Sequence, residues 1–241
     1  MSFDAGPADG PLPRHEPRAH PNPTRPALGE ERWRFALMGS NLPWTKGCAI
    51  YVGTSKVTTV FMAGSITIRH LDSLVEARIH NIVASGFQVV IGDADGADAA
   101  IQAYLNTAGS ARVTVYCSGD SPRNNRGGWP VEVVATRHAK SSRAFFAAKD
   151  LRMADVADIG LMVWDTKSPG TLRNVIELLV RKKRAVIFLD ADRTFKTITR
   201  VDQLEELVLC MPADARQNAE RKIRLTSRGE ELKHTQASTS P

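Results

Sequence analysis

The chain has 241 residues, of which 42% are hydrophobic and 24% charged, with a formal net charge of +6; this balance suits one globular domain with polar tails. No apolar run approaches the roughly 20 residues that span a bilayer, and the N-terminus lacks the apolar core of a secretory signal. Cys48, Cys117 and Cys210 lie far apart without a CxxC motif, which argues against a disulfide framework or zinc site and favours a cytoplasmic location.

The two ends of the chain differ in composition from its middle. Residues 1–31 are rich in Pro, Gly, Arg and His, so we expect a disordered N-terminal tail. Residues 32–56 form an N-terminal extension that is ambiguous: RWRFALMGS and CAIYVG could be a strand pair joined by NLPWTKG, and whether they add to the sheet is left open. We expect residues 57–210 to form the folded domain and residues 211–241 to form a polar, largely disordered C-terminal tail.

Within 57–210, apolar runs that favour strands alternate with stretches that have helical spacing. The expected strands are VTTVFMAGS (57–65), FQVVIGD (87–93), ARVTVYCSG (111–119), VEVVA (131–135), IGLMVWD (159–165) and AVIFLD (185–190). The expected helices are LDSLVEARIHNIVASG (71–86), GADAAIQAYLNTAG (96–109), SRAFFAAKDLRMADVAD (142–158), GTLRNVIELLVRKKR (170–184) and VDQLEELVLC (201–210). Continuous apolar strands are buried on both faces, so we predict a Rossmann-like α/β fold, an open and mostly parallel sheet with helices on both faces.

Four polar loops with glycines follow the predicted strands. They are AGSITIRH (63–70), GDADGAD (92–98), CSGDSPRNNRGG (117–128) and WDTKSPGT (164–171). In open parallel sheets the ligand binds beyond the carboxyl ends of the strands, so we expect these loops to gather at one edge.

The loop at 164–171 enters a helix through Gly170 and Thr171. A helix N-terminus offers unpaired N–H groups and the positive end of a dipole, and glycine lets the backbone approach a phosphate closely. This predicts an anion site with the Thr171 hydroxyl as a further donor. The alternative is that Ser168 or Thr171 only caps the helix.

Two other loops carry charged candidates. Asp93 and Asp98 flank a glycine turn at Gly96 and could accept from a ribose hydroxyl; the spacing lacks the Glu of a calcium loop, and no metal site is predicted. Arg123 and Arg126 suit phosphate through their guanidinium forks. The Trp129 indole either stacks on a base or is an ordinary buried side chain.

Several motifs in order resemble a known family. MAGSITIRHLDSLV, VVIGDADGADAAIQAYL, VTVYCSGDSPRNNRGGWPV, AKDLRMADVADIGLMVWD and SPGTLRNVIELL together resemble the SLOG superfamily of Rossmann-like proteins. Within it they are similar to the bacterial YpsA-related branch, mostly described as hypothetical nucleotide-binding proteins. The superfamily also includes the "lonely guy" phosphoribohydrolases and the DNA-processing protein of transformation. The resemblance covers about residues 57–190.

The resemblance implies a nucleotide pocket lined by the loops at Gly64–Ser65, Gly92–Asp98 and Ser168–Thr171. The phosphoribohydrolases carry a catalytic Glu where this chain has Asn174, and an Arg before the Lys of a helix where this chain has Ala148 before Lys149. An Asn cannot act as a general base, so cleavage by that mechanism is not expected.

These observations favour a module that binds a nucleotide or nucleotide derivative as a sensor. One alternative is a hydrolase that cleaves an N-glycosidic or phosphate bond, with Asp93, Asp165 or Lys149 as catalytic candidates; another is DNA binding, supported by a positive excess in the central domain. No cofactor is identified beyond the nucleotide-type ligand, no membrane partner is expected, and a homo-oligomer is left open. The expected binding residues are Gly64, Ser65, Thr67, Gly92, Asp93, Gly96, Asp98, Arg123, Arg126, Lys149, Asp165, Ser168, Gly170, Thr171 and Asn174.

Overall fold

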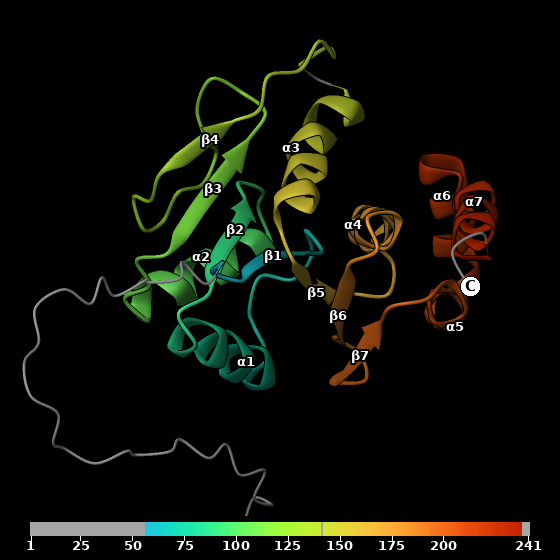
Figure 1. Cartoon of the computed structure of the whole chain (residues 1–241), viewed down its shortest axis with the longest axis horizontal. Coiled ribbons are helices and arrows are strands. Elements are labelled where there is room, and N and C mark those ends of the chain that lie inside the picture. The colour runs from blue at the N-terminus through green and yellow to red at the C-terminus, as the bar shows by residue number, and fades with distance from the viewer. Residues whose placement is uncertain (1–55, 141, 238–241) are drawn as a thin grey trace, which may run out of the picture. The chain divides into compact units, whose positions relative to one another are not determined.

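A computed structural model describes residues 56–140 and 142–237, and in them the chain forms an open, Rossmann-like α/β sheet (Figure 1). The strand order is β4-β3-β2-β1-β5-β6-β7, and every neighbouring pair is parallel except β6 and β7. The strands are β1 Thr59–Gly64, β2 Gln88–Gly92, β3 Val113–Cys117, β4 Val131–Val133, β5 Ile159–Trp164, β6 Arg184–Leu189 and β7 Thr194–Ile198.

Helices cover both faces of the sheet, as predicted. They are α1 Ser73–Ala84, α2 Ala97–Thr107, α3 Arg143–Val156, α4 Pro169–Val180, α5 Val201–Leu209, α6 Ala213–Ile223 and α7 Leu225–Ala237. Side chains alternate along each strand, so Val60 and Met62 of β1 pack in a core with α1 and α2, while Phe61 and Ala63 pack in a second core with α3 and α4. The central strands are therefore buried on both sides, which explains their continuous apolar sequence.

The C-terminal part of the chain differs from the prediction. Residues 213–237 form α6 and α7 instead of a disordered tail, and Ala219, Ile223, Leu225 and Leu232 are buried in the same core as α4. Few apolar residues suffice here because α4 supplies the opposite apolar surface. The helices stay polar on their outer faces, and this polarity led to the wrong prediction.

Two smaller differences concern the end of one helix and one additional strand. The helix predicted at 170–184 ends at Val180, because Lys182 takes a left-handed conformation with φ +56° and Arg184 already begins β6. Strand β7 was not predicted; it is short, antiparallel to β6 at the edge of the sheet, and has only two apolar residues, Phe195 and Ile198.

The predictions for 1–31 and for 32–55 lie outside the described residues. Within residues 56–140 and 142–237, no helix combines the length and apolar character needed to cross a membrane.

Candidate functional site

The strand order places a change of direction between β1 and β5. The chain runs outward from β1 through β2 and β3 to β4, then returns to β5 on the other side of β1. Gly64 at the end of β1 lies opposite Val163 of β5, so the loops that follow these strands start side by side. Such a switch point is where open α/β sheets bind their ligands.

Three polar side chains from both loops meet at this switch point. Ser65 is fully buried, and its Oγ donates to Asp165 Oδ1 at 2.9 Å and lies 3.3 Å from Thr171 Oγ1. The Asp165 backbone N–H donates to Ser65 Oγ at 3.1 Å. The structure therefore brings together residues that are 100 or more positions apart in the chain.

Asp165 is occupied by hydrogen bonds within the protein. Its carboxylate accepts from Ser65, from Thr67 Oγ1 at 2.7 Å, and from the backbone N–H groups of Lys167 and Ser168 at 2.9 and 2.7 Å. Burial raises the pKa of Asp165, but these donors outweigh burial and hold the pKa below its ordinary value. An ionised carboxylate with four donors serves to hold the loop and is a poor general base.

The loop held by Asp165 has a strained backbone. Thr166 has φ +60°, which a β-branched residue rarely adopts. A residue keeps such an unfavourable backbone conformation only where the surrounding contacts hold it in place, and residues of this kind cluster at functional sites.

The first turn of α4 has no side-chain cap. Ser168 is the N-cap residue but makes no capping hydrogen bond, and Pro169 occupies the first turn. A Cβ added at Gly170 would meet nothing closer than Ser168 Oγ at 3.9 Å, so internal packing does not require glycine there. Pro169 has no N–H and Leu172 N–H donates to the Ser168 carbonyl at 3.4 Å, so the N–H groups of Gly170 and Thr171 are the ones left at this helix N-terminus, where the dipole is positive.

A second cluster lies at the ends of β2 and β3, around a buried lysine. Lys149 Nζ is 2.9 Å from Asp150 Oδ1, 3.8 Å from Asp93 Oδ1 and 3.9 Å from Asp98 Oδ2, and only 4% of Lys149 is exposed. Gly92 makes room for this cluster, since a Cβ there would collide with Lys149 Nζ and Asp98 Oδ2.

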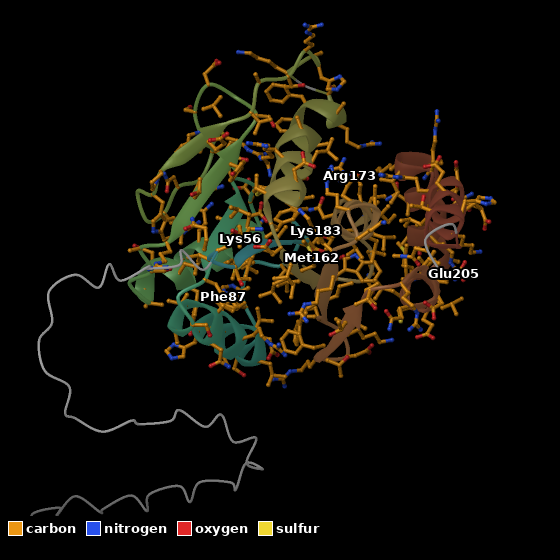
Figure 2. All side chains as sticks on the ribbon, viewed as in Figure 1. Lys56, Phe87, Met162, Arg173, Lys183 and Glu205 are labelled. Atoms are coloured by element: carbon orange, nitrogen blue, oxygen red, sulfur yellow. The ribbon has the colours of Figure 1, made fainter. Side chains whose placement is uncertain are left out.

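Two arginines complete the charge balance. Arg123 binds Asp93 through Nε and Nη2 at 3.0 and 2.9 Å, and Arg173 Nη2 donates to Asp150 Oδ2 at 2.9 Å. Arg173, labelled in Figure 2, reaches from α4 to α3 through this pair. Three carboxylates thus face three cations, so the cluster is neutral when all are ionised.

The environment separates the pKa values of the carboxyl groups in this cluster. Burial raises the pKa of Asp98 to about 6 in spite of Lys149. Burial also raises the pKa of Asp93, but the hydrogen bonds from Arg123 outweigh it and the pKa is lowered. Burial lowers the pKa of Lys149, but Asp150, Asp98 and Asp93 together raise it above its ordinary value. Lys149 is therefore an ammonium at neutral pH and is unsuited to act as a base or nucleophile.

Most predicted residues fall into two neighbouring groups. Gly64, Ser65, Thr67, Asp165, Ser168, Gly170 and Thr171 surround the β1–β5 switch point, and Gly92, Asp93, Asp98, Arg123 and Lys149 form the charged cluster. Gly96 and Arg126 instead line a separate cavity on α2. Asn174 is buried on α4, and its Oδ1 has no partner among the described residues.

Sequence reasoning missed Arg173 and left Trp129 undecided. Arg173 stands in an amphipathic helix, where an arginine usually faces solvent; its Nε is buried without a partner within the described residues. Trp129 is 8% exposed, packs in the core with α1 and α2, and donates through Nε1 to the Ser110 carbonyl at 2.8 Å. The structure favours a buried tryptophan over a stacking platform.

Within residues 56–140 and 142–237, no group of three or more His, Cys, Asp and Glu side chains is arranged to hold a metal ion. Comparison with models of known families, with curated proteins and with solved structures found no match.

Proposed function

We propose that this chain binds a nucleotide or nucleotide derivative at the β1–β5 switch point and acts as a sensor or ligand-binding module. The contact of Ser65 with Asp165 and Thr171 carries the proposal, because it joins the two loops at the edge where such sheets bind ligands. The resemblance to the SLOG superfamily supports the same conclusion, and we propose membership of its YpsA-related branch.

The phosphate of the ligand would lie at the N-terminus of α4. Gly170 offers its backbone beside open space, and Ser168 leaves the first turn without a side-chain cap. The N–H groups and the helix dipole there attract an anion. The strained φ of Thr166 adds support, because it lies in the loop that shapes this turn.

Asn174 extends the proposed site along α4. It lies three residues after Thr171 and therefore on the same helix face. A buried amide oxygen without a partner costs about 1–3 kcal/mol, and a ligand donor would recover that cost.

Several observations support binding without turnover. The Asp165 carboxylate is saturated with donors, Lys149 is held as an ammonium, and Asn174 cannot carry a negative charge. These are groups that a hydrolase at this edge would use.

Replacement of Gly170 by Ala tests the phosphate position. The added methyl fits the fold and favours the helix by up to about 1 kcal/mol, so stability should be unchanged or higher. The same methyl would keep a phosphate from the backbone. Isothermal titration of the full chain with AMP and ADP-ribose should show weaker binding for Gly170→Ala, with a thermal melt of the same sample as control. Equal affinity in both proteins would overturn this placement.

Thr171→Val provides an independent test. It removes, with nearly unchanged volume, the hydroxyl that contacts Ser65 Oγ at 3.3 Å. A ligand phosphate that takes the proton of this hydroxyl in place of Ser65 would gain a hydrogen bond to a charged group, which is worth about 1.5–3 kcal/mol. We therefore expect the dissociation constant for AMP to rise about 10-fold or more. An unchanged constant would count against the role of this hydroxyl.

A hydrolase is the second candidate, favoured by the separated pKa values of Asp93 and Asp98 beside Lys149. Two carboxyl groups in one site with different protonation are typical of acid–base pairs. Chromatography after incubation with AMP or ADP-ribose detects released base or phosphate. Release that is lost in both Asp93→Asn and Asp98→Asn would replace the binding proposal with an enzyme; no release from the wild-type chain supports the sensor.

A further inference from the structure

A cavity of about 310 Å³ lies over the start of α2, apart from the two clusters described above. Arg69 comes from the loop after β1, Arg126 from the loop after β3, and Asp95 and Gly96 from the turn before α2. Three alanines of α2 form the rest of the wall: Ala99, Ala100 and Ala103.

Both arginines have free guanidinium groups. Within residues 56–140 and 142–237, neither side chain makes a hydrogen bond or an ion pair, whereas the nearby Arg123 is held by Asp93 in a two-point contact. A planar guanidinium fork fits phosphate, and two such forks line this one cavity.

The loop of Arg126 is fixed by hydrogen bonds of the polar side chains of Gln102 and Asn124. Gln102 is fully buried; its Oε1 accepts from the Arg126 backbone N–H at 3.0 Å, and its Nε2 donates to the Gly92 carbonyl at 2.8 Å. Asn124 Nδ2 donates to the Asp93 carbonyl at 3.0 Å and to Asp95 Oδ1 at 2.9 Å. Such supporting bonds preorganise a site, and a merely solvated loop does not require them.

The loop of Arg69 is also held against α2. Gly96 has φ +76°, and a Cβ there would collide with the backbone of Ile66. Ile68, one residue before Arg69, is buried in the core with α1 and α2. The backbone is thus anchored at Arg126 itself and at Ile68 next to Arg69, so the Cα positions of both arginines are set by the fold.

The lining also identifies the kind of ligand. Two guanidinium groups against one carboxylate favour an anion, while the Asp95 carboxylate accepts hydrogen bonds from hydroxyl groups, as acidic residues do with ribose. The small side chains of Ala100 and Ala103 leave the space open and offer an apolar wall.

We propose that this cavity binds a phosphorylated sugar, with the phosphate between Arg69 and Arg126 and a sugar hydroxyl on Asp95. The sugar is either free or the sugar–phosphate end of a nucleotide. The site does not depend on the β1–β5 switch point, since none of its lining residues belongs to that group.

Isothermal titration of the full chain with ribose 5-phosphate tests the proposal, with AMP, inorganic phosphate and ribose as comparison probes. Arg69→Gln and Arg126→Gln should each weaken binding of ribose 5-phosphate about tenfold or more. Arg152→Gln removes an equal charge at an exposed position of α3, outside the cavity, and should leave binding unchanged. Ala103→Leu should fill the cavity and abolish binding, whereas Asn106→Leu, at an exposed position of the same helix that does not line the cavity, should not.

The comparison probes separate the two sources of the sugar phosphate. Tighter binding of ribose 5-phosphate than of AMP indicates a free sugar phosphate, and the reverse order indicates a nucleotide, provided that Arg69→Gln weakens both. Inorganic phosphate that binds as tightly as ribose 5-phosphate would overturn the role of Asp95. Absence of binding, or binding unaffected by Arg69→Gln, Arg126→Gln and Ala103→Leu, would overturn the site. Thr171→Val should leave the binding of ribose 5-phosphate at this cavity intact, although it weakens AMP binding at the switch point, so failure here is distinguishable from failure at the switch point.

Discussion

At the scale of single residues, Asp98 has the clearest energetic consequence. Its pKa is raised from 3.8 to about 6, so the folded state binds this proton more tightly than the unfolded state. The resulting stability is fully present below pH 4 and is lost as the pH rises through 6. The lowered pKa values of Asp93 and Asp165 act in the opposite direction and at more acidic pH, so they do not mask this loss.

We expect the free energy of unfolding of the wild-type chain to lose on the order of 3 kcal/mol between pH 4 and pH 7 through this one group. Urea titrations at several pH values measure it, and the difference between wild type and Asp98→Asn isolates the contribution from other titrating groups. A difference that is constant across this range would show that Asp98 titrates normally.

At the scale of elements, the contact between the β1 loop and the start of α2 depends on glycine. Gly96 combines φ +76° with a backbone contact to Ile66, and Ala97 N–H donates to the Ser65 carbonyl at 3.1 Å. This junction holds the loop after β1 against the start of α2.

Gly109→Ala is a matched control for Gly96→Ala. Gly109 has φ +65°, but a Cβ there would meet nothing within 4 Å, so its replacement measures only the cost of the left-handed backbone, about 1–2 kcal/mol. Gly96→Ala should cost clearly more, because the methyl also displaces the Ile66 backbone. Chemical denaturation measures both; equal losses would mean that the loop adjusts without cost.

At the scale of the whole molecule, α6 and α7 belong to the same cooperative unit as the sheet. Leu232 of α7 is 2% exposed and shares a core with Trp164 at the end of β5. The Glu177 carboxylate of α4 also pairs with Arg228 of α7 and with Arg181. Removal of α7 contacts should therefore destabilise the sheet itself.

Leu232→Ala should lower the free energy of unfolding by about 2–5 kcal/mol, the usual range for a buried leucine. Tryptophan fluorescence and circular dichroism should report a single shifted transition. Leu209→Ala, at a position 71% exposed, should change stability by less than about 0.5 kcal/mol. An unshifted fluorescence transition in Leu232→Ala would show that α7 unfolds independently.

Much of the architecture follows from local pattern. The apolar runs at β1, β2, β3, β5 and β6 predict buried parallel strands, and Gly86, with φ +70°, follows the end of α1, where glycine is favoured. The convergence of Ser65 with Thr171 also follows, because parallel strands place their carboxyl ends at one edge. These features depend on spacing and residue type, which the sequence states directly.

Other features depend on which surfaces meet. The sequence by itself determined an α/β sheet and the edge where its polar loops gather, because hydrophobic periodicity and chain direction are local properties. Only the tertiary structure decided that α6 and α7 pack on α4, that Trp129 is buried, and that Asp165 is saturated with donors. Burial and hydrogen bonding are relations between distant segments, and their free energy arises only when the chain has brought those segments together.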